Sequence, residues 1–302
     1  MKPGAGVLNM KFMGRTQKSK KEITRYPIRL QAQTKGITFG LSEAWQYRDL
    51  VLLLARKSFT TTYRQTMLGP LWIVFQPLLS SLICMFIFGH VAAIGTDGIP
   101  QILFYFASSS VWELFAFSLN SNAGTFVNNA YLFSKVYFPR LTVPFSNLLV
   151  GFLKFSIQFV ITMILVILYT ARGIIHPLWA AFPLLPISFL VLSFFGMSVG
   201  ILLSSLTTRY RDLLVIVNIA VNLWMYASAV VYPLSSLPAG TLRTIILLNP
   251  VTSQMELVRR ILLGAGGFYP LYCFGGLAIM TLIFLAGTAL FNRVERTFAD
   301  TV

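Results

Sequence analysis

Charged residues are scarce in this sequence, and acidic residues are the scarcest. Only 11% of its 302 residues are Asp, Glu, Lys or Arg, with 9 Asp and Glu against 24 Lys and Arg. About a quarter of the residues in a soluble domain are charged, so the composition excludes an ordinary soluble protein. Hydrophobic residues make up 56% of the chain, and mean hydropathy is +0.73. We therefore predict an all-α integral membrane protein.

Side chains that bind metals or catalyse reactions are also rare. The two cysteines, Cys84 and Cys273, lie inside apolar runs, which is typical of packing thiols. The two histidines, His90 and His176, fall near the ends of apolar stretches. The sequence contains no metal-ligand spacing, no phosphate-binding GxxxxGK[ST] loop and no acid-base set at one depth. We expect no catalytic site, no metal and no cofactor on this chain.

Six apolar stretches are long enough to cross a bilayer, which takes about 20 residues in a helix. They are residues 70–93, 101–120, 143–170, 178–206, 213–232 and 271–291. Of the 24 Lys and Arg residues, 13 lie within residues 1–67, and the loops expected on the same side add more. The positive-inside rule then places both termini in the cytoplasm. This topology accounts for the basic excess, so we expect no nucleic-acid partner.

The segment before the first span divides into two parts. Residues 1–40 mix Lys, Arg, Gln, Thr and Gly without periodicity, and we predict a mobile basic cytoplasmic tail near anionic lipid headgroups. A transmembrane domain is predicted from residue 41 to residue 302. At its start, residues 43–60 have an apolar core too short to span, which favours an amphipathic helix lying in the membrane interface. A helix packed on protein at the soluble side is the alternative.

Two prolines stand near the start of the first span. Gly69 and Pro70 end the interfacial segment and begin a new helix, because proline is tolerated in a first turn. Pro77 lies inside the span, where it removes a backbone hydrogen bond and is expected to kink the helix. A bent helix of this kind is expected beside a cavity.

Two charged residues fall inside predicted spans. Glu113 lies midway along the second span and Lys154 within the third. Each is about ten residues from the cytoplasmic end, or about 15 Å at 1.5 Å per residue. Charges in the membrane are costly and are candidates for function. We predict an intramembrane ion pair between neighbouring helices, with a role in ligand transit or gating as the alternative.

Polar and aromatic residues recur at helical spacing on two spans. Asn218, Asn222 and Tyr226 share one face of the fifth span. The first span carries Trp72, Phe75 and Phe86. Aromatic faces can stack on the apolar C–H faces of sugar rings, and polar groups on one face avoid lipid. Both stripes are compatible with a pathway lining or with packing between helices.

Two connections are predicted to form short helices. Residues 121–140 make up the largest cytoplasmic loop, where Asn120, Ser121 or Asn122 could cap a short helix that docks into a partner protein. Residues 249–264 on the outer side read as a helix capped by Asn249, opened by Pro250 and closed by Gly264. Its predicted apolar face is Val251, Met255, Val258 and Leu262, and its predicted polar face is Glu256, Arg259 and Arg260. Such a helix could cover a pore mouth or lie passively in the interface.

Several motifs occur in an order typical of one family. They are YRQTMLGPLWIVFQPLL at 63–79, LFSKVYFPRLTVPFSNLL at 132–149, LTTRYRDL at 206–213, LNP at 248–250 and VERTFAD at 294–300. With these motifs the chain resembles the membrane subunit of ABC exporters for lipid-linked polysaccharides, the O-antigen type. The resemblance covers about residues 41–302.

The resemblance implies an assembly and a substrate. Members of this family are homodimers of six-span protomers in the bacterial cytoplasmic (inner) membrane, paired with two copies of an ATPase subunit that binds ATP and Mg²⁺. They move undecaprenyl-diphosphate-linked polysaccharide from cytoplasm to periplasm. Residues 43–60 correspond to the family's interface helix, 121–137 to its cytoplasmic coupling helix and about 240–264 to its short periplasmic gate helices.

The resemblance also suggests roles for individual residues. The family's channel lies between protomers and is formed largely by the first and fifth spans, which here supply Trp72, Phe75, Phe86, Asn218, Asn222, Tyr226 and Tyr232. ATPase movement would be received by residues of the coupling segment, namely Asn122, Phe126, Asn128, Asn129, Tyr131 and Lys135. The lipid diphosphate would meet Arg56, Lys57 and Arg64 beside the interface helix.

Other functions remain open at this point. Exporters of capsule polysaccharide and of teichoic acid share the family's architecture. An ion-driven flippase for lipid-linked sugars would need titratable groups in the membrane, for which the sequence offers Glu113 and Lys154. A membrane-embedded transferase would need a catalytic acid-base set, which the sequence does not supply.

Overall fold

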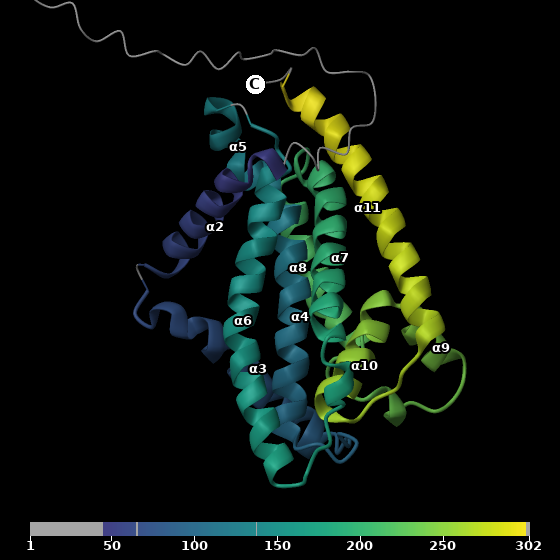
Figure 1. The fold of residues 1–302 in the computed structure, drawn as a ribbon. Helices are drawn as coiled ribbons and strands as arrows, with labels where there is room; N and C mark the ends of the chain where they lie inside the picture. Colours follow the sequence, from purple (N-terminus) through teal and green to yellow (C-terminus); the bar gives the residue numbers. More distant parts are fainter. Residues whose placement is uncertain (1–44, 65, 137, 300–302) are drawn as a thin grey trace, which may run out of the picture. The chain divides into compact units, whose positions relative to one another are not determined.

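The computed structural model describes residues 45–64, 66–136 and 138–299, with backbone only for 292–299. In these residues every regular element is helical, which confirms the predicted all-α fold (Figure 1). The longer helices are α2 (Arg48–Tyr63), α3 (Trp72–Cys84), α4 (Gln101–Ala123), α5 (Thr125–Lys135), α6 (Thr142–Ala171), α7 (Leu184–Thr207), α8 (Leu213–Ala227), α9 (Thr241–Leu248), α10 (Pro250–Leu263) and α11 (Pro270–Ala299). Short elements are η1 (Gly69–Leu71), η2 (Met85–Val91), η3 (Trp179–Ala181) and η4 (Leu234–Ser236). The predicted tail, residues 1–40, lies outside the described residues.

Helix α4 forms the centre of the bundle. Its most apolar window of 18 residues is 78% buried, against 22% for the span that contains α3. It packs on α7 and α6, which flank it in Figure 1, and also on α3 and α8. An aromatic cluster joins these helices: the ring of Phe115 lies 5.6 Å from that of Phe195 and 5.3 Å from that of Trp224. The core is therefore an aromatic and aliphatic layer around α4.

Two glycines of α7 allow it to approach α4 at backbone distance. A Cβ atom added at Gly196 would lie 2.5 Å from the carbonyl oxygen of Phe115, and one added at Gly200 would lie 2.5 Å from that of Leu119. Glycines four residues apart on one helix face are typical of close helix packing in membranes. This spacing fixes the register of α7 on α4, and therefore the position of every helix packed on that pair.

Five of the described helical segments are long and apolar enough to cross a membrane. They are Gly69–Val91, Gln101–Ala123, Thr142–Ala171, Leu184–Thr207 and Pro270–Phe291. The predicted fifth span, residues 213–232, is different: α8 ends at Ala227 and has 15 residues. At 1.5 Å per residue it is about 22 Å long, shorter than a hydrocarbon core of about 30 Å. The segment after α8 is irregular, with Ala229 at a φ of +50°.

Pro77 leaves the carbonyl of Ile73 without its helical partner, because proline has no N–H. The side-chain amide of Gln158 on α6 donates to this oxygen at 2.9 Å. Beyond α3 the helix widens into the π-helical turn η2, Met85–Val91. The backbone hydrogen bond that Pro77 removes is therefore replaced by one from α6, which joins α3 to α6.

The structure corrects two predictions about the short helices. Asn120, Ser121 and Asn122 cap nothing, because α4 continues to Ala123 and the break falls at Gly124. Helix α10 has the predicted caps: Asn249 accepts from the backbone N–H of Val251 at 3.1 Å, and Gly264 is left-handed.

However, α10 is not a surface helix. Glu256 is 2% exposed and Arg259 is 3% exposed, so most of the predicted polar face is buried along with the apolar one. Arg260 alone of its three charged residues stays exposed. Helix α10 packs against α11, α7, α9 and α4, which cover it on several sides.

Candidate functional site

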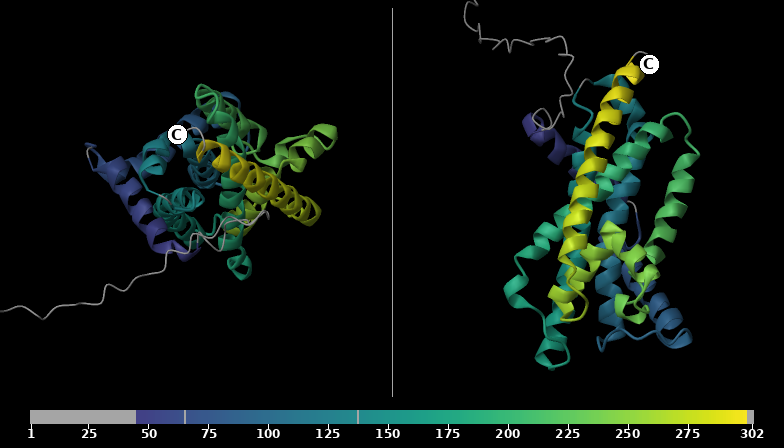
Figure 2. Two further views of the ribbon diagram at one scale, coloured as in Figure 1. Left: turned by 90° about the horizontal axis from the view of Figure 1, so that it is seen from above. Right: turned by 90° about the vertical axis from the view of Figure 1, so that its right-hand side faces the viewer.

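The outward side of α8 carries the predicted polar stripe. Val217 and Val221 are buried against the bundle, whereas Asn218, Asn222 and Tyr226 are exposed. In the right-hand view of Figure 2, α8 follows α7 at the edge of the bundle. The amide of Asn218 donates to the carbonyl of Leu214 within the helix. This stripe therefore faces away from the rest of the chain.

Exposed aromatic rings also lie on the first span. Trp72, Phe75 and Phe86 are 42%, 44% and 64% exposed. Trp72 and Phe75 meet edge to face, with ring centroids 5.5 Å apart. Phe88 of η2 lies 6.3 Å from the ring of Tyr226, which brings the first span and α8 together. We call the exposed residues Trp72, Phe75, Phe86, Asn218, Asn222 and Tyr226 the open face.

Tyr232 supports the open face from behind. It is half-buried, and its hydroxyl donates to the carbonyl of Tyr226 at 3.0 Å. Burial raises the pKa of this hydroxyl, so it stays protonated and acts as a donor. It therefore closes the end of α8, and Tyr226 presents its ring outward.

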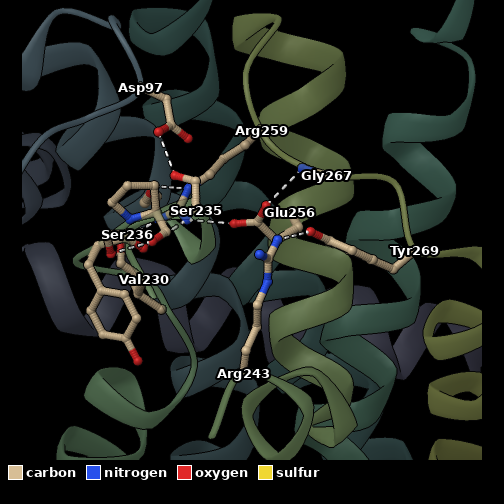
Figure 3. A network of polar contacts seen from close by, with 12 residues as sticks. Asp97, Val230, Ser235, Ser236, Arg243, Glu256, Arg259, Gly267 and Tyr269 are labelled. Carbon is tan, nitrogen blue, oxygen red and sulfur yellow. Dashed lines mark hydrogen bonds and ion pairs between the residues drawn. The ribbon is translucent and has the colours of Figure 1, made fainter. Parts of the chain in front are cut away.

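A buried polar network lies beside the end of α8 (Figure 3). Arg259 of α10 donates to the carbonyls of Val230 at 2.5 Å and Tyr232 at 3.2 Å, both in the segment after α8. It also donates to the hydroxyl of Ser108 on α4 at 3.0 Å. Its guanidinium lies 4.3 Å from the ring centroid of Phe104. One side chain thus joins α10, α4 and the irregular segment.

Glu256 completes this network. One carboxylate oxygen accepts from Arg259 at 3.2 Å, and the other accepts from the backbone N–H of Gly267 at 2.9 Å. Burial lowers the pKa of the Arg259 guanidinium and the charge of Glu256 raises it; an arginine in this setting remains protonated. Nearby, Ser235 donates to Asp97 and Arg243 donates to the hydroxyl of Tyr269. We call the residues Ser108, Val230, Tyr232, Glu256, Arg259 and Gly267 the outer network.

Glu113 and Lys154 line one cavity but do not form the predicted ion pair. Both belong to the described residues, and no nitrogen–oxygen contact within 4.0 Å joins them. The Lys154 ammonium instead lies 3.9 Å from the ring centroid of Phe117 and 5.8 Å from that of Tyr63. This cation–π contact competes with the carboxylate for the ammonium. The cavity, with a volume of about 270 Å³, is lined by Thr62, Tyr63, Thr66, Trp72, Ile73, Gln76, Pro77, Glu113, Lys154 and Gln158. We call it the inner cavity.

The open face offers flat rings and amides, which suit a weakly held, repetitive ligand. Along α4, Glu113 of the inner cavity lies about 7.5 Å from Ser108, which Arg259 of the outer network contacts. Within the described residues no group of three metal-ligating side chains is present.

Comparison with known proteins gives the family. The profile of the family described as "ABC-2 type transporter" matches residues 49–263, more than half of the chain. The chain belongs to this family. An O-antigen export system permease protein RfbA of Klebsiella pneumoniae is 28% identical over 257 residues, which are 83% of this chain and 94% of that protein. A protein of the same name from Myxococcus xanthus is 26% identical over 269 residues, or 86% of this chain and 98% of that protein.

Membership makes this chain a multi-pass membrane subunit of a transporter.

The residues predicted to receive ATPase movement divide into two groups by their burial. Asn122 and Phe126 are fully buried, so they cannot touch a partner as predicted. Asn122 donates to the carbonyl of Ser118, and Phe126 stacks on Phe291 of α11 with centroids 4.6 Å apart. Phe126 therefore holds α5 to α11 of the ABC-2 bundle, and Asn122 is buried within α4.

The other four coupling residues lie on or near the surface of α5. Asn128, Tyr131 and Lys135 are exposed, and Asn129 is half-buried at a break in the helix. A cavity of about 400 Å³ separates this helix from α2 and is lined by both, including Lys57, Thr61, Asn128 and Tyr131. In this ABC-2 chain, α5 therefore presents a surface beside the predicted interface helix.

The predicted diphosphate-binding residues lie outside the bundle. Arg56, Lys57 and Arg64 are exposed, and α2 packs on α6 through its other side, where Ala55 is buried. Helix α2 therefore packs on the ABC-2 domain and leaves its basic residues accessible.

The sequence interpretation missed the outer network. The sequence pattern predicts a solvent-facing side for Glu256 and Arg259, because three charged residues fall together in a helix with an apolar face. A signal was available: α10 has no other charged residue, and its only uncharged polar residues are Thr252, Ser253 and Gln254. Such a helix suits burial if its charges are paired.

Proposed function

We propose that this chain is the transmembrane subunit of an ATP-driven exporter of undecaprenyl-diphosphate-linked O-antigen. It would act as a homodimer with two copies of an ATPase subunit in the bacterial inner membrane, both termini in the cytoplasm. ATP and Mg²⁺ would bind to the partner. The observation that carries the proposal is the likeness, over 83–86% of the chain, to proteins named O-antigen export system permease.

The open face supports a passage shared between two copies. Its rings and amides are exposed at membrane depth, where a lipid-facing helix needs neither. Facing a second copy, they would enclose a polar and aromatic tunnel. Contacts on such a lining are individually weak, so a glycan would not be trapped at one place.

Movement would reach this passage from the ATPase through α5 and α2. The exposed residues Tyr131 and Lys135 are the proposed receiving surface, and Asn122 and Phe126 would transmit the force to α4 and α11. The basic residues Arg56, Lys57 and Arg64 would meet the diphosphate as the lipid enters. Glycan export of the capsule or teichoic-acid type is the second candidate, since it needs the same passage.

Deletion of the gene tests the function. We expect completed, lipid-linked polymer to accumulate inside the cell and to disappear from its surface, with full recovery on complementation. Export that continues after ATP depletion but stops with a proton uncoupler would instead indicate an ion-driven flippase. Glycan analysis of the accumulated polymer separates O-antigen from capsule or teichoic acid.

The open face gives a second expected result. Trp72→Ala and Tyr226→Ala should each slow export about two- to tenfold, equivalent to the roughly 0.5–1.5 kcal/mol of an aromatic contact. Pulse-labelled polymer reaching the cell surface measures the rate, and co-purification of the ATPase measures assembly. Phe274→Ala is the matched control, because Phe274 is 71% exposed on α11, outside the open face. Wild-type export in both variants would remove the lining role.

A further inference from the structure

The inner cavity contains three polar groups that lack a hydrogen-bond or ion-pair partner within the described residues. They are the carboxylate of Glu113, the ammonium of Lys154 and the side-chain oxygen of Gln158. Gln158 is only 2% exposed, so its unpartnered oxygen is buried. Buried acceptors and charges without partners are costly and rare, and they point to a bound polar group.

A hydrogen bond from its nitrogen fixes the orientation of the Gln158 amide. Its nitrogen donates to the carbonyl of Ile73, the oxygen that Pro77 leaves free. A flipped amide would bring two oxygens together, so the nitrogen and oxygen are assigned by this contact. The cavity therefore holds two acceptors, Gln158 and Glu113, and one cationic donor, Lys154.

The size and depth of the cavity narrow the choice of ligand. Its volume of about 270 Å³ compares with about 30 Å³ for one water in the liquid. Lys154 lies about 26 Å along α6 from the end at Ala171 and about 18 Å from the start at Thr142. Exposed residues form its outer side, namely Thr62, Thr66, Trp72 and Gln76. Thr62 and Tyr63 end α2, which is predicted to lie in the membrane interface, so a lipid headgroup of that leaflet can reach this opening.

We propose that the inner cavity binds the headgroup of an ethanolamine phospholipid. Its ammonium donates to the carboxylate of Glu113 and the oxygen of Gln158, and its phosphate accepts from the ammonium of Lys154. A zwitterion satisfies both charges and leaves no net charge buried. A choline headgroup carries methyl groups in place of the donors, and a glycerol headgroup lacks the positive charge.

Tyr63 adds a further donor to this arrangement. It is the last residue of α2, and burial, followed by the negative charge of Glu113, raises the pKa of its hydroxyl. The hydroxyl therefore stays protonated and can donate to the phosphate, and the ammonium of Lys154 lies 5.8 Å from the Tyr63 ring centroid. Because Tyr63 belongs to α2, the bound lipid would link α2 to α3, α4 and α6.

Native mass spectrometry of the purified full-length protein tests this site. The protein is delipidated and then supplied with dioleoyl phosphatidylethanolamine, phosphatidylcholine or phosphatidylglycerol. We expect about tenfold stronger retention of the ethanolamine lipid than of the choline lipid, which corresponds to one charge-assisted contact. Equal retention of the two would overturn the proposal, since only the ammonium donors distinguish them.

Variants assign the two halves of the headgroup. Glu113→Gln should abolish the preference for ethanolamine over choline and leave phosphatidylglycerol binding unchanged. Lys154→Met should weaken all three lipids, and the control Lys135→Met, at an exposed lysine outside the cavity, should change none. An unfolded Glu113→Gln protein would also lose phosphatidylglycerol, so misfolding is recognisable. In that case Gln158→Met, which keeps both charges, should reduce the ethanolamine preference.

Two competitors identify the source of the ligand. Soluble glycerophosphoethanolamine should displace the lipid only at concentrations far above that of the lipid, because it lacks the acyl chains. Displacement at equal concentration would overturn the assignment to a lipid, and displacement by a neutral disaccharide alone would overturn the headgroup chemistry. Retention is measured without transport, so this result is independent of the exported substrate.

Discussion

Replacing Arg259 with methionine is expected to destabilise the protein by about 3–5 kcal/mol, the cost of leaving one partner of a buried ion pair uncompensated. The substitution removes donors from Ser108, Val230 and Tyr232 as well as from Glu256. Thermal unfolding of the detergent-solubilised protein, followed by size-exclusion chromatography, measures the loss. Because Arg259 holds the segment after α8, the variant should also lower the yield of folded protein in the membrane.

Arg260→Met is the matched control for this experiment. It removes the same charge one residue along α10, but Arg260 is exposed and donates to a single loop carbonyl, that of Gly266. Its stability should change by less than about 0.5 kcal/mol. Arg259→Lys should restore less than half of the loss, since an ammonium lacks the planar fork. Equal melting of the Arg259→Met and Arg260→Met proteins would contradict the assigned role of the outer network.

The combination of Arg259→Met with Glu256→Met should be milder than Arg259→Met alone. The double variant removes the carboxylate that the single variant leaves buried without a cation. The carbonyls of Val230 and Tyr232 still lose their donor, so recovery is partial. Additive losses would mean that the two side chains do not act as a pair.

Gly200→Ala is the second change with a large expected effect. The new Cβ would lie 2.5 Å from the carbonyl oxygen of Leu119, 2.7 Å from the Cβ of Asn122 and 3.1 Å from the backbone nitrogen of Ala123. Two of these atoms belong to the backbone of α4, so the helices must separate. Overpacking of this kind costs about 1–3 kcal/mol, and at backbone contact we expect the upper part of that range. The same thermal measurement reports it.

Gly275→Ala provides the comparison within a transmembrane helix. Gly275 lies in α11, and nothing is within 4 Å of a Cβ added there. Alanine should leave stability unchanged or raise it by up to about 1 kcal/mol, because glycine disfavours a helix. If the Gly200→Ala and Gly275→Ala proteins unfold at the same temperature, the close approach of α7 to α4 is wrong.

Long apolar runs were predictable because a membrane span is a local property. The runs at 101–120, 143–170 and 271–291 match α4, α6 and the membrane part of α11 to within a few residues. The caps of α10 were predictable for the same reason, since Asn249, Pro250 and Gly264 act on their immediate neighbours. The roles of the open face and of the exposed α5 residues stay predictions that the variants above can test.

The failures concern side chains whose partners are distant in sequence. At the end of α8, Asn249 donates to the carbonyl of Ala227, and Arg259 of α10 donates to the carbonyl of Val230 in the segment that follows. Apolar residues such as Val230 and Val231 gave no sign of this break. Glu113 and Lys154 line the same cavity, yet the Lys154 ammonium lies over the ring of Phe117 and does not pair with the Glu113 carboxylate. Hydropathy and periodicity describe each helix alone and carry no information about such contacts.

By itself, the sequence determined that this chain is a helical membrane protein with a defined set of apolar segments, because hydrophobic length and charge act within each segment. The tertiary structure alone decided which charges are buried, which aromatic rings remain open and where α8 ends. Those outcomes depend on helix register, set by the glycines of α7 against α4, and on hydrogen bonds between residues more than 25 positions apart, such as that of Arg259 to Val230.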